Sequence, residues 1–180
     1  TRYDSLYTFT WVVPVTKPRL AVHNPGPYPT PSTSTWFFDR FQKWNSTLFN
    51  VDVYIRNLDV GWAITNASFC LCYDTTIIDT EVANITINTA AWNEPYEVAV
   101  IHEVPDKVNI TVRTTQSLSG DVKVATIKFH IKYQAMYPTV TVTDLTFCDV
   151  ILMNHIVEIP TDPPENGSIT IVGYLKIIPP

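Results

Sequence analysis

The sequence is poor in glycine, in charged side chains and in long apolar runs. Only 5 of its 180 residues are glycine and 16% are charged. No apolar run approaches the roughly 18–20 residues that span a bilayer as a helix, so we expect no membrane span. The net charge of −5 offers no basic surface, which makes nucleic acid an unexpected partner. A long stretch with the 3.6-residue period of an amphipathic helix is also missing.

The motifs of common enzymes and cofactor sites are missing as well. The chain contains no G-x-S-x-G, C-x-x-C, H-E-x-x-H or glycine-rich phosphate loop. Its histidines fall in separate segments without metal-ligand spacing: His23, His102, His130 and His155. A C-x-C pair with one distant cysteine and no nearby histidine is weak as a metal site. We therefore expect no enzyme activity, no catalytic residue, no cofactor and no metal.

What the sequence has instead is a two-residue alternation of apolar and polar side chains, the period of strands with one buried face. Within 64–80, one face carries Ala67, Phe69, Leu71 and Tyr73, and the other carries Ser68, Cys70 and Cys72. Residues 48–57 alternate in the same way. Further strands are expected at 19–23, 76–87, 96–104, 107–115, 122–133, 139–150, 151–159 and 168–178. Short, regularly spaced strands predict an all-β sandwich, as a single domain over residues 18–180.

Two segments interrupt this pattern. Residues 24–35 are rich in Pro, Ser and Thr and predict an extended loop. The following WFFDRFQKW has Phe37, Phe41 and Trp44 at helical spacing after a Ser34/Thr35 cap, which predicts one or two helical turns. Aromatic residues could form an exposed platform for carbohydrate or pack on the core; the candidates are Trp36, Trp44, Trp62 and Trp92.

Sequons indicate the compartment. Five sites fit N-x-S/T without proline at x: Asn45, Asn66, Asn84, Asn109 and Asn166. With eleven asparagines in the chain, chance would give about two. The alternation predicts that Asn66 and Asn109 point outward. We therefore expect a secreted or cell-surface glycoprotein carrying N-linked glycans at these sites. The start at Thr1 is interpreted as a mature chain after signal removal, with an artificial boundary as the alternative.

Several segments together resemble cohesin domains. They occur in the matching order at residues 50–58 (NVDVYIRNL), 67–80 (ASFCLCYDTTIIDT), 121–133 (DVKVATIKFHIKY), 140–152 (VTVTDLTFCDVIL) and 165–173 (ENGSITIVG). The resemblance implies a nine-stranded jelly-roll β-sandwich related to the immunoglobulin fold. Cohesins of cellulosomes bind dockerins through one sheet face, on which Asn66, Cys70 and Cys72 would lie here. A glycan on that face would obstruct a protein partner.

The same resemblance bears on the cysteines. Its topology lays the Phe69 strand beside residues 139–150, which implies one disulfide between Cys148 and either Cys70 or Cys72. The remaining thiol would be buried. Cys70 and Cys72 themselves lie roughly 6.5–7 Å apart along one strand, too far for a comfortable bridge. Three free buried thiols are the alternative.

The sequence predicts that residues 1–17 form a strand-like arm and a proline hinge. Alternation puts Tyr7, Phe9, Trp11 and Val13 on one face and Leu6, Thr8, Thr10 and Val12 on the other, before Pro14 and Pro18. In layout the chain is similar to donor-strand filament subunits, such as the thread-like surface filaments of archaea. We therefore expect residues from about Tyr3 to Val13 to insert into the next copy, head to tail. The alternative is an ordinary first strand within the chain's own fold.

These features define the functional hypotheses. The first is a non-catalytic extracellular structural glycoprotein that polymerises with copies of itself into a surface filament. The second is a cohesin-type or carbohydrate-binding module of a larger secreted or adhesin protein. One repeat of a large sheath protein is a third.

Overall fold

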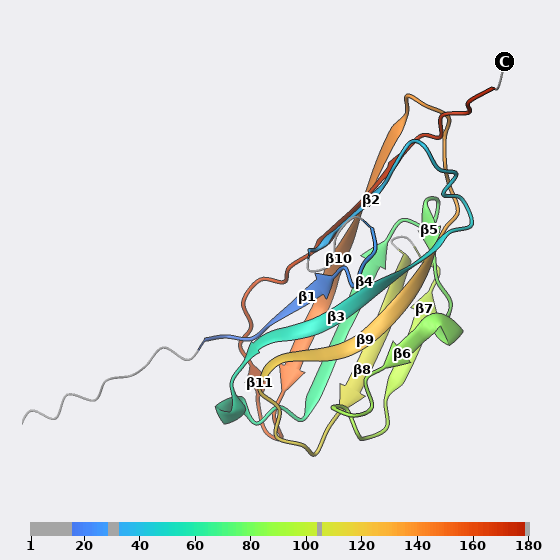
Figure 1. Ribbon diagram of the computed structural model, residues 1–180. Coiled ribbons are helices and arrows are strands. Elements are labelled where there is room, and N and C mark those ends of the chain that lie inside the picture. The colour runs from blue at the N-terminus through green and yellow to red at the C-terminus, as the bar shows by residue number, and fades with distance from the viewer. Residues whose placement is uncertain (1–15, 29–32, 104–105, 179–180) are drawn as a thin grey trace, which may run out of the picture.

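The computed structural model describes residues 16–28, 33–103 and 106–178, which form two β-sheets packed face to face (Figure 1). Sheet I has the order β1-β3-β9-β5, with β6 also pairing with β9. Its strands are β1 (Arg19–His23), β3 (Leu48–Leu58), β5 (Ile78–Asp79), β6 (Ile85–Ile87) and β9 (Gly120–Ile131). Two short 3₁₀ turns are also present: η1 (Val60–Trp62) follows β3, and η2 (Val82–Asn84) lies between β5 and β6. No described helix is long and apolar enough to cross a membrane.

Sheet II has the order β2-β12-β10-β4-β8-β7, with β11 also pairing with β10. Its strands are β2 (Thr35–Phe38), β4 (Asn66–Tyr73), β7 (Glu97–Ile101), β8 (Asp106–Arg113), β10 (Val140–Met153), β11 (Glu158–Ile159) and β12 (Gly167–Val172). The pairs are antiparallel except that β2 runs parallel to β12. This arrangement confirms the expected all-β, jelly-roll type of sandwich.

The core forms where the predicted apolar faces of the two sheets meet. Its largest fully buried side chains include Trp36, Phe38, Ile55, Leu71, Trp92, Ile110, Ile127 and Phe129. Phe129 of sheet I stacks on Phe49 at 5.9 Å between ring centroids and meets Tyr73 of sheet II edge-on at 5.2 Å. The two sheets are therefore joined through aromatic contacts as well as aliphatic packing.

The expected helix in WFFDRFQKW is wrong. Residues 35–38 form β2, with Trp36 and Phe38 buried and Phe37 exposed, which is the period of a strand. Pairing with β12 satisfies the backbone of this segment, and Trp36 donates its indole N–H to the carbonyl of Asn50 at 3.1 Å. The tertiary contact thus overrides a helical spacing that had only one or two turns to support it.

Two strand boundaries also differ from expectation. Residues 76–87 do not form one strand: they give β5, η2 and β6. Strands were expected at 139–150 and 151–159, but the first one, β10, continues to Met153 and the second is reduced to the two-residue β11. A bulge between Cys148 and Ile151, with Asp149 at φ 51°, lets β10 bend and continue.

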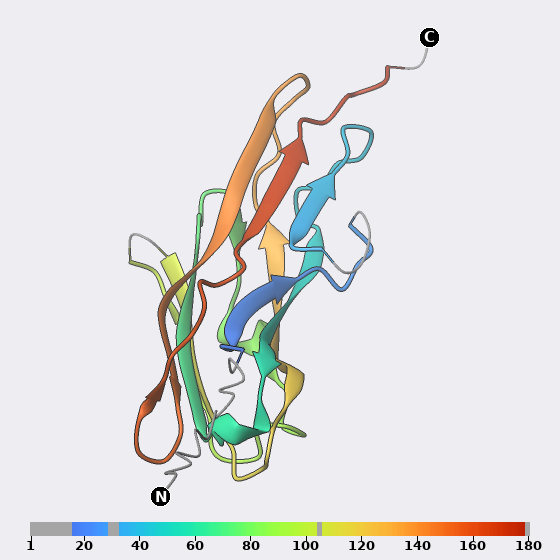
Figure 2. The same ribbon diagram turned by 90° about the vertical axis from the view of Figure 1, so that its left-hand side faces the viewer.

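The strand β10 changes partners along its length. Residues Val140 to Leu145 pair with β12, whereas Thr146 to Met153 pair with β4 on the other side. The neighbouring β4 ends at Tyr73 because Asp74 closes a turn, its carboxylate accepting the backbone N–H of Thr76 at 2.8 Å. The upper part of β10 therefore extends past the end of β4 (Figure 2).

Residues 1–15 of the predicted arm and hinge lie outside the described residues. The donor-strand residues Leu6, Tyr7, Phe9, Trp11 and Val13 all belong to this range, and so does Pro14 of the proposed hinge. Whether this strand is donated or kept stays a prediction, as does the division of the chain at residue 17.

Candidate functional site

The outer face of sheet II, which points away from sheet I, gathers the polar residues of β4 and β8. Along β4 the side chains of Ala67, Phe69, Leu71 and Tyr73 are buried, so Asn66, Ser68, Cys70 and Cys72 point to the outer face. Along β8, Asn109 lies between the fully buried Val108 and Ile110. The alternation in the sequence therefore predicts the correct face for both Asn66 and Asn109.

A shallow groove of about 440 Å³ crosses this outer face between β7, β8, β4 and the bulge of β10. Polar residues dominate its lining: Ser68, Glu97, Lys107, Asn109, Thr111 and Asp149. Ser68 and Thr111 share a hydroxyl hydrogen bond of 3.0 Å across β4 and β8. The amide oxygen of Asn109 is buried and has no hydrogen-bond partner. The groove offers hydrogen-bonding groups and both charge signs, but little apolar surface.

The cysteines meet beside this groove. Cys70 and Cys148 are directly opposite each other in the antiparallel pair β4/β10, with 5.0 Å between their Cα atoms, and they form a disulfide. The partner of Cys148 is therefore Cys70 and not Cys72. The alternative of three free thiols is wrong. Cys72 is free, as expected, but its side chain is half-buried where a buried one was expected. It lies on the outer face, which water reaches in part.

The free thiol of Cys72 lies next to the bridge. Its Sγ is 2.7 Å from the Sγ of Cys148, and all three sulfur atoms lie within 4.8 Å of one another. Burial raises the pKa of the Cys72 thiol; nearby Lys107 lowers it and Asp149 raises it. The raised pKa keeps Cys72 mostly protonated at neutral pH. Because the thiolate is the species that attacks a disulfide, Cys72 exchanges only slowly with the neighbouring bridge. Two of the sulfurs are bonded to each other, so the cluster does not present three thiolates to a metal ion.

We predict that Cys72 replaces Cys70 when Cys70 is lost. The wild-type chain should show one reactive thiol after denaturation, whereas Cys70→Ser should show none, because the three sulfur atoms lie within 4.8 Å of one another and Cys72 can then bridge to Cys148. Cys148→Ser is the control and should show two. Thiol titration with peptide mapping checks these counts. Three thiols in the wild type, or two in Cys70→Ser, would contradict the prediction.

Several titratable side chains contact each other within sheets or near strand ends. His130 Nδ1 lies 2.9 Å from Asp79 Oδ1, and His102 Nδ1 lies 3.4 Å from Asp106 Oδ1. In the described part of the chain no hydroxyl or thiol is hydrogen-bonded to a histidine. The buried Asp52 accepts Lys123 Nζ at 2.8 Å and Thr126 Oγ1 at 2.6 Å, both from the neighbouring β9. These contacts satisfy a buried carboxylate and tie β3 to β9.

The proposed aromatic platform is not present. Trp36, Trp44 and Trp92 are buried, and Trp62 is half-buried against the core. Trp92 donates its indole N–H to the carbonyl of Lys123 at 3.2 Å. A carbohydrate-binding platform of exposed tryptophans is therefore wrong for these residues.

Comparison with solved structures identifies the architecture. A non-cellulosomal cohesin from the hyperthermophilic archaeon Archaeoglobus fulgidus gives a TM-score of 0.64 at 14% identity, over 87% of this chain and 92% of that one. CaCohA2 from Clostridium acetobutylicum gives 0.63 at 17% identity, over 87% and 92%. The OlpC cohesin from Clostridium thermocellum, solved in complex with a dockerin, gives 0.63 at 10% identity, over 88% and 95%. The chain has a cohesin-like fold.

At these identities the likeness concerns the fold. The sequence matches no protein-family profile, and no curated protein matches it either. The cohesin resemblance of the sequence is thus confirmed as a resemblance of fold. The weaker resemblance to archaeal filament subunits gains no support from these structures.

The cohesin-like body leaves the five sequons partly or fully accessible. Asn45, Asn66, Asn84 and Asn109 are half-buried and Asn166 is exposed. Asn166 also accepts the backbone N–H of Phe147 at 3.0 Å through its amide oxygen, so its side chain holds β10 to the turn before β12. Glycosylation of these residues stays a prediction.

We expect the native protein to carry N-linked glycans at Asn45, Asn66, Asn84, Asn109 and Asn166. Intact mass spectrometry should then give a mass well above the 20.4 kDa of the polypeptide, falling to that value on deglycosylation. Asn→Gln variants at single sequons should each remove one glycan mass, and Asn88→Gln, which lies in no sequon, should remove none. A native mass at the polypeptide value would refute the expectation.

Proposed function

We propose that this chain is a non-catalytic, extracellular structural glycoprotein whose copies assemble head to tail into a surface filament by strand donation. One observation carries the proposal: sheet II has an unpaired strand edge along the upper part of β10, while residues 3–13 have the alternation of a strand. An added strand pairs with such an edge through main-chain hydrogen bonds. A strand of one copy on an edge of the next gives a linear polymer.

The energetics favour insertion of the arm over exposure in water. Tyr7, Phe9 and Trp11 form one face of residues 3–13. Each large apolar side chain gains about 1.5–3 kcal/mol when it is buried. A strand with this face needs a partner sheet, and a second copy supplies one without any other protein. Head-to-tail contacts grow into fibres when the rotation between successive copies does not close a ring.

The extracellular setting is supported by chemistry in the described body. A disulfide such as Cys70–Cys148 persists in oxidising compartments. The five sequons point to the same setting. The related fold belongs to cohesin modules, which are non-catalytic interaction domains, and this is consistent with a role in assembly rather than in chemistry.

The test of this function is the size distribution of the native full-length chain. Sedimentation and negative-stain electron microscopy should show filaments whose length grows with concentration. A stable monomer at high concentration would show that strand donation between copies is wrong.

A second function is favoured by the groove on the outer face of sheet II. Cohesins in related structures are bound to dockerins, and the resemblance of the sequence to cohesins implies that this sheet face is the one that would bind a dockerin. A glycan on Asn109, which lines the groove, would obstruct such a partner. A pull-down with a dockerin as the probe separates the two functions, using the Asn109→Gln variant, which carries no glycan in the groove. Capture of the dockerin supports the second function, whereas filament formation does not require the groove.

A further inference from the structure

The upper part of β10 has one unpaired edge. Val140 to Leu145 pair with β12 on one side, while pairing with β4 starts only at Thr146. On the side of β4, the described residues provide no backbone hydrogen bond to residues 140–145. Figure 2 shows this part of β10 rising above the end of β4 and the turn that follows it.

The chemistry of this edge is that of a pairing surface. Edges that must stay unpaired usually carry several charged side chains, lysine above all, or proline or a bulge. The sequence of residues 140–145 is VTVTDL, which has no lysine or proline and a single charge, Asp144, and the bulge of β10 lies farther along at 148–151. Val140 and Val142 are 57% and 58% exposed, and both point to the outer face. The edge is therefore regular, and its outer side carries Val140 and Val142 followed by the exposed Asp144.

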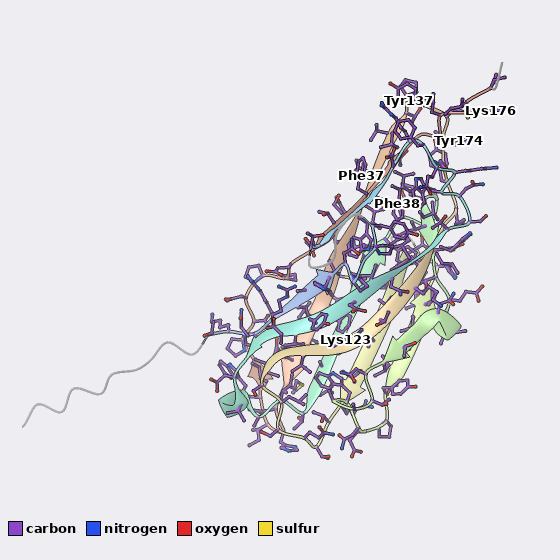
Figure 3. All side chains as sticks on the ribbon, in the orientation of Figure 1. Phe37, Phe38, Lys123, Tyr137, Tyr174 and Lys176 are labelled. Carbon is purple, nitrogen blue, oxygen red and sulfur yellow. A yellow bond between two sulfur atoms is a disulfide. The ribbon has the colours of Figure 1, made fainter. Side chains whose placement is uncertain are left out.

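The apolar surface continues across the neighbouring strands. Val142 is opposite Thr170 of β12, which is opposite Phe37 of β2, a residue that is 47% exposed. Tyr137 lies at the same end of the molecule as Phe37 (Figure 3). A strand added beside Val140 and Val142 would extend this row. Either face of residues 5–13 would bring apolar side chains alongside it, because both faces contain them.

The position of the edge fits a head-to-tail contact. The start of β1 lies in the lower half of the molecule as drawn, and the unpaired part of β10 lies at the upper end (Figure 1). A strand that precedes β1 in one copy and pairs at the upper end of the next adds copies in one direction. Such a contact leaves an unused donor at one end and an unused edge at the other.

The other long edge of sheet II is less suitable. The outer edge of β7 begins with Glu97, which is paired with Arg113 at 3.1 Å. Its Ala99 is opposite Asn109, so a glycan on Asn109 would lie next to that edge. By contrast, Asn66 lies at the far end of β4 from residues 140–145, opposite Met153.

We propose that the β10 edge, residues 140–145, is the acceptor site for residues 3–13 of a second copy of this chain. The inference rests on the proposed strand donation and gives it a location. The occupant is a strand that alternates aromatic residues with threonine over residues 7–11, held by main-chain hydrogen bonds to β10 and by contacts with Val140 and Val142.

A photo-crosslinking residue tests the location. It is placed at Val142 in the full-length chain, and at Ala99 of β7 as the matched control; both side chains are exposed. Irradiation of filaments should link position 142, and not position 99, to a peptide within residues 3–13. Filaments with links from position 99 alone would overturn the location and leave strand donation intact. Absence of filaments from both variants and the unlabelled chain would overturn strand donation itself.

A charge variant provides the second test. Val140→Lys/Val142→Lys should raise the concentration needed for filaments about tenfold, since two apolar cross-strand contacts are lost and charge is placed on the edge. Val60→Lys/Val157→Lys is the matched control, because both valines are 56% exposed and lie away from the edge. Equal thresholds for the two variants would overturn the assignment. Circular dichroism verifies that both remain folded.

Discussion

Deletion of residues 1–13 is expected to abolish filaments and to leave a folded monomer. The core of the described sandwich is built from strands between Leu20 and Ile171, none of which lies in the deleted segment. The deletion removes the donor strand and keeps the acceptor edge of β10. Electron microscopy should therefore find no filaments, while circular dichroism should retain the β-sheet spectrum of the full-length chain.

A peptide of residues 1–13 should bind the shortened chain. It restores the missing strand without a covalent link, so a one-to-one complex is expected by native mass spectrometry. A peptide of the same composition in scrambled order is the control, because it lacks the alternation of Tyr7, Phe9 and Trp11. Filaments from the shortened chain, or equal binding of both peptides, would count against strand donation.

Phe129→Ala should produce a large loss of stability, because its side chain joins the two sheets. Phe129 is fully buried, stacks on Phe49 and meets Tyr73 of the facing sheet. Truncation of a buried phenylalanine costs about 3–5 kcal/mol in the free energy of unfolding. The measurement is urea denaturation in the chain that lacks residues 1–13, since polymerisation would otherwise stabilise the folded state.

The matched control for this variant is Phe37→Ala. Phe37 has the same side chain but is 47% exposed on β2. Its truncation should lower the free energy of unfolding by less than about 1 kcal/mol. Similar losses for the two variants would mean that the aromatic contact between the sheets does not hold the sandwich together.

The sequence predicts those parts of the fold in which one strand face is buried. The alternation around Phe69 and Val51 places each side chain on its correct face, and Arg19–His23 forms the expected strand. These predictions succeed because a two-residue period needs only local information. The outward positions of Asn66 and Asn109 follow from the same rule.

The parts that fail depend on contacts between distant segments. β2 is a strand because β12 pairs with it, and nothing in WFFDRFQKW itself specifies this partner. The continuity of β10 depends on a bulge at Asp149, which tolerates a positive φ of 51°. Likewise, the register of β4 on β10 puts Cys70, rather than Cys72, opposite Cys148. Alternation fixes the face of a cysteine but not its cross-strand partner.

The unpaired edge of β10 had no signal in the sequence either. It arises because Asp74 ends β4 at Tyr73 while β10 continues to Val140, and only the register of the two strands reveals the difference in length. The donor segment, in contrast, is visible from its alternation and its prolines. The sequence therefore predicts a donor, and the structure supplies an acceptor.

The most direct test of strand donation is whether residues 3–13 contact their own body or that of another copy. A photo-crosslinking residue replaces Phe9 in heavy-isotope chains, which are then assembled with unlabelled chains that lack it. Mass spectrometry of the linked peptides distinguishes the two cases. Strand donation predicts links from heavy peptides that carry the substituted position 9 to light body peptides. If light chains are in excess and every link still joins a heavy position-9 peptide to a heavy body peptide, the strand stays in its own fold.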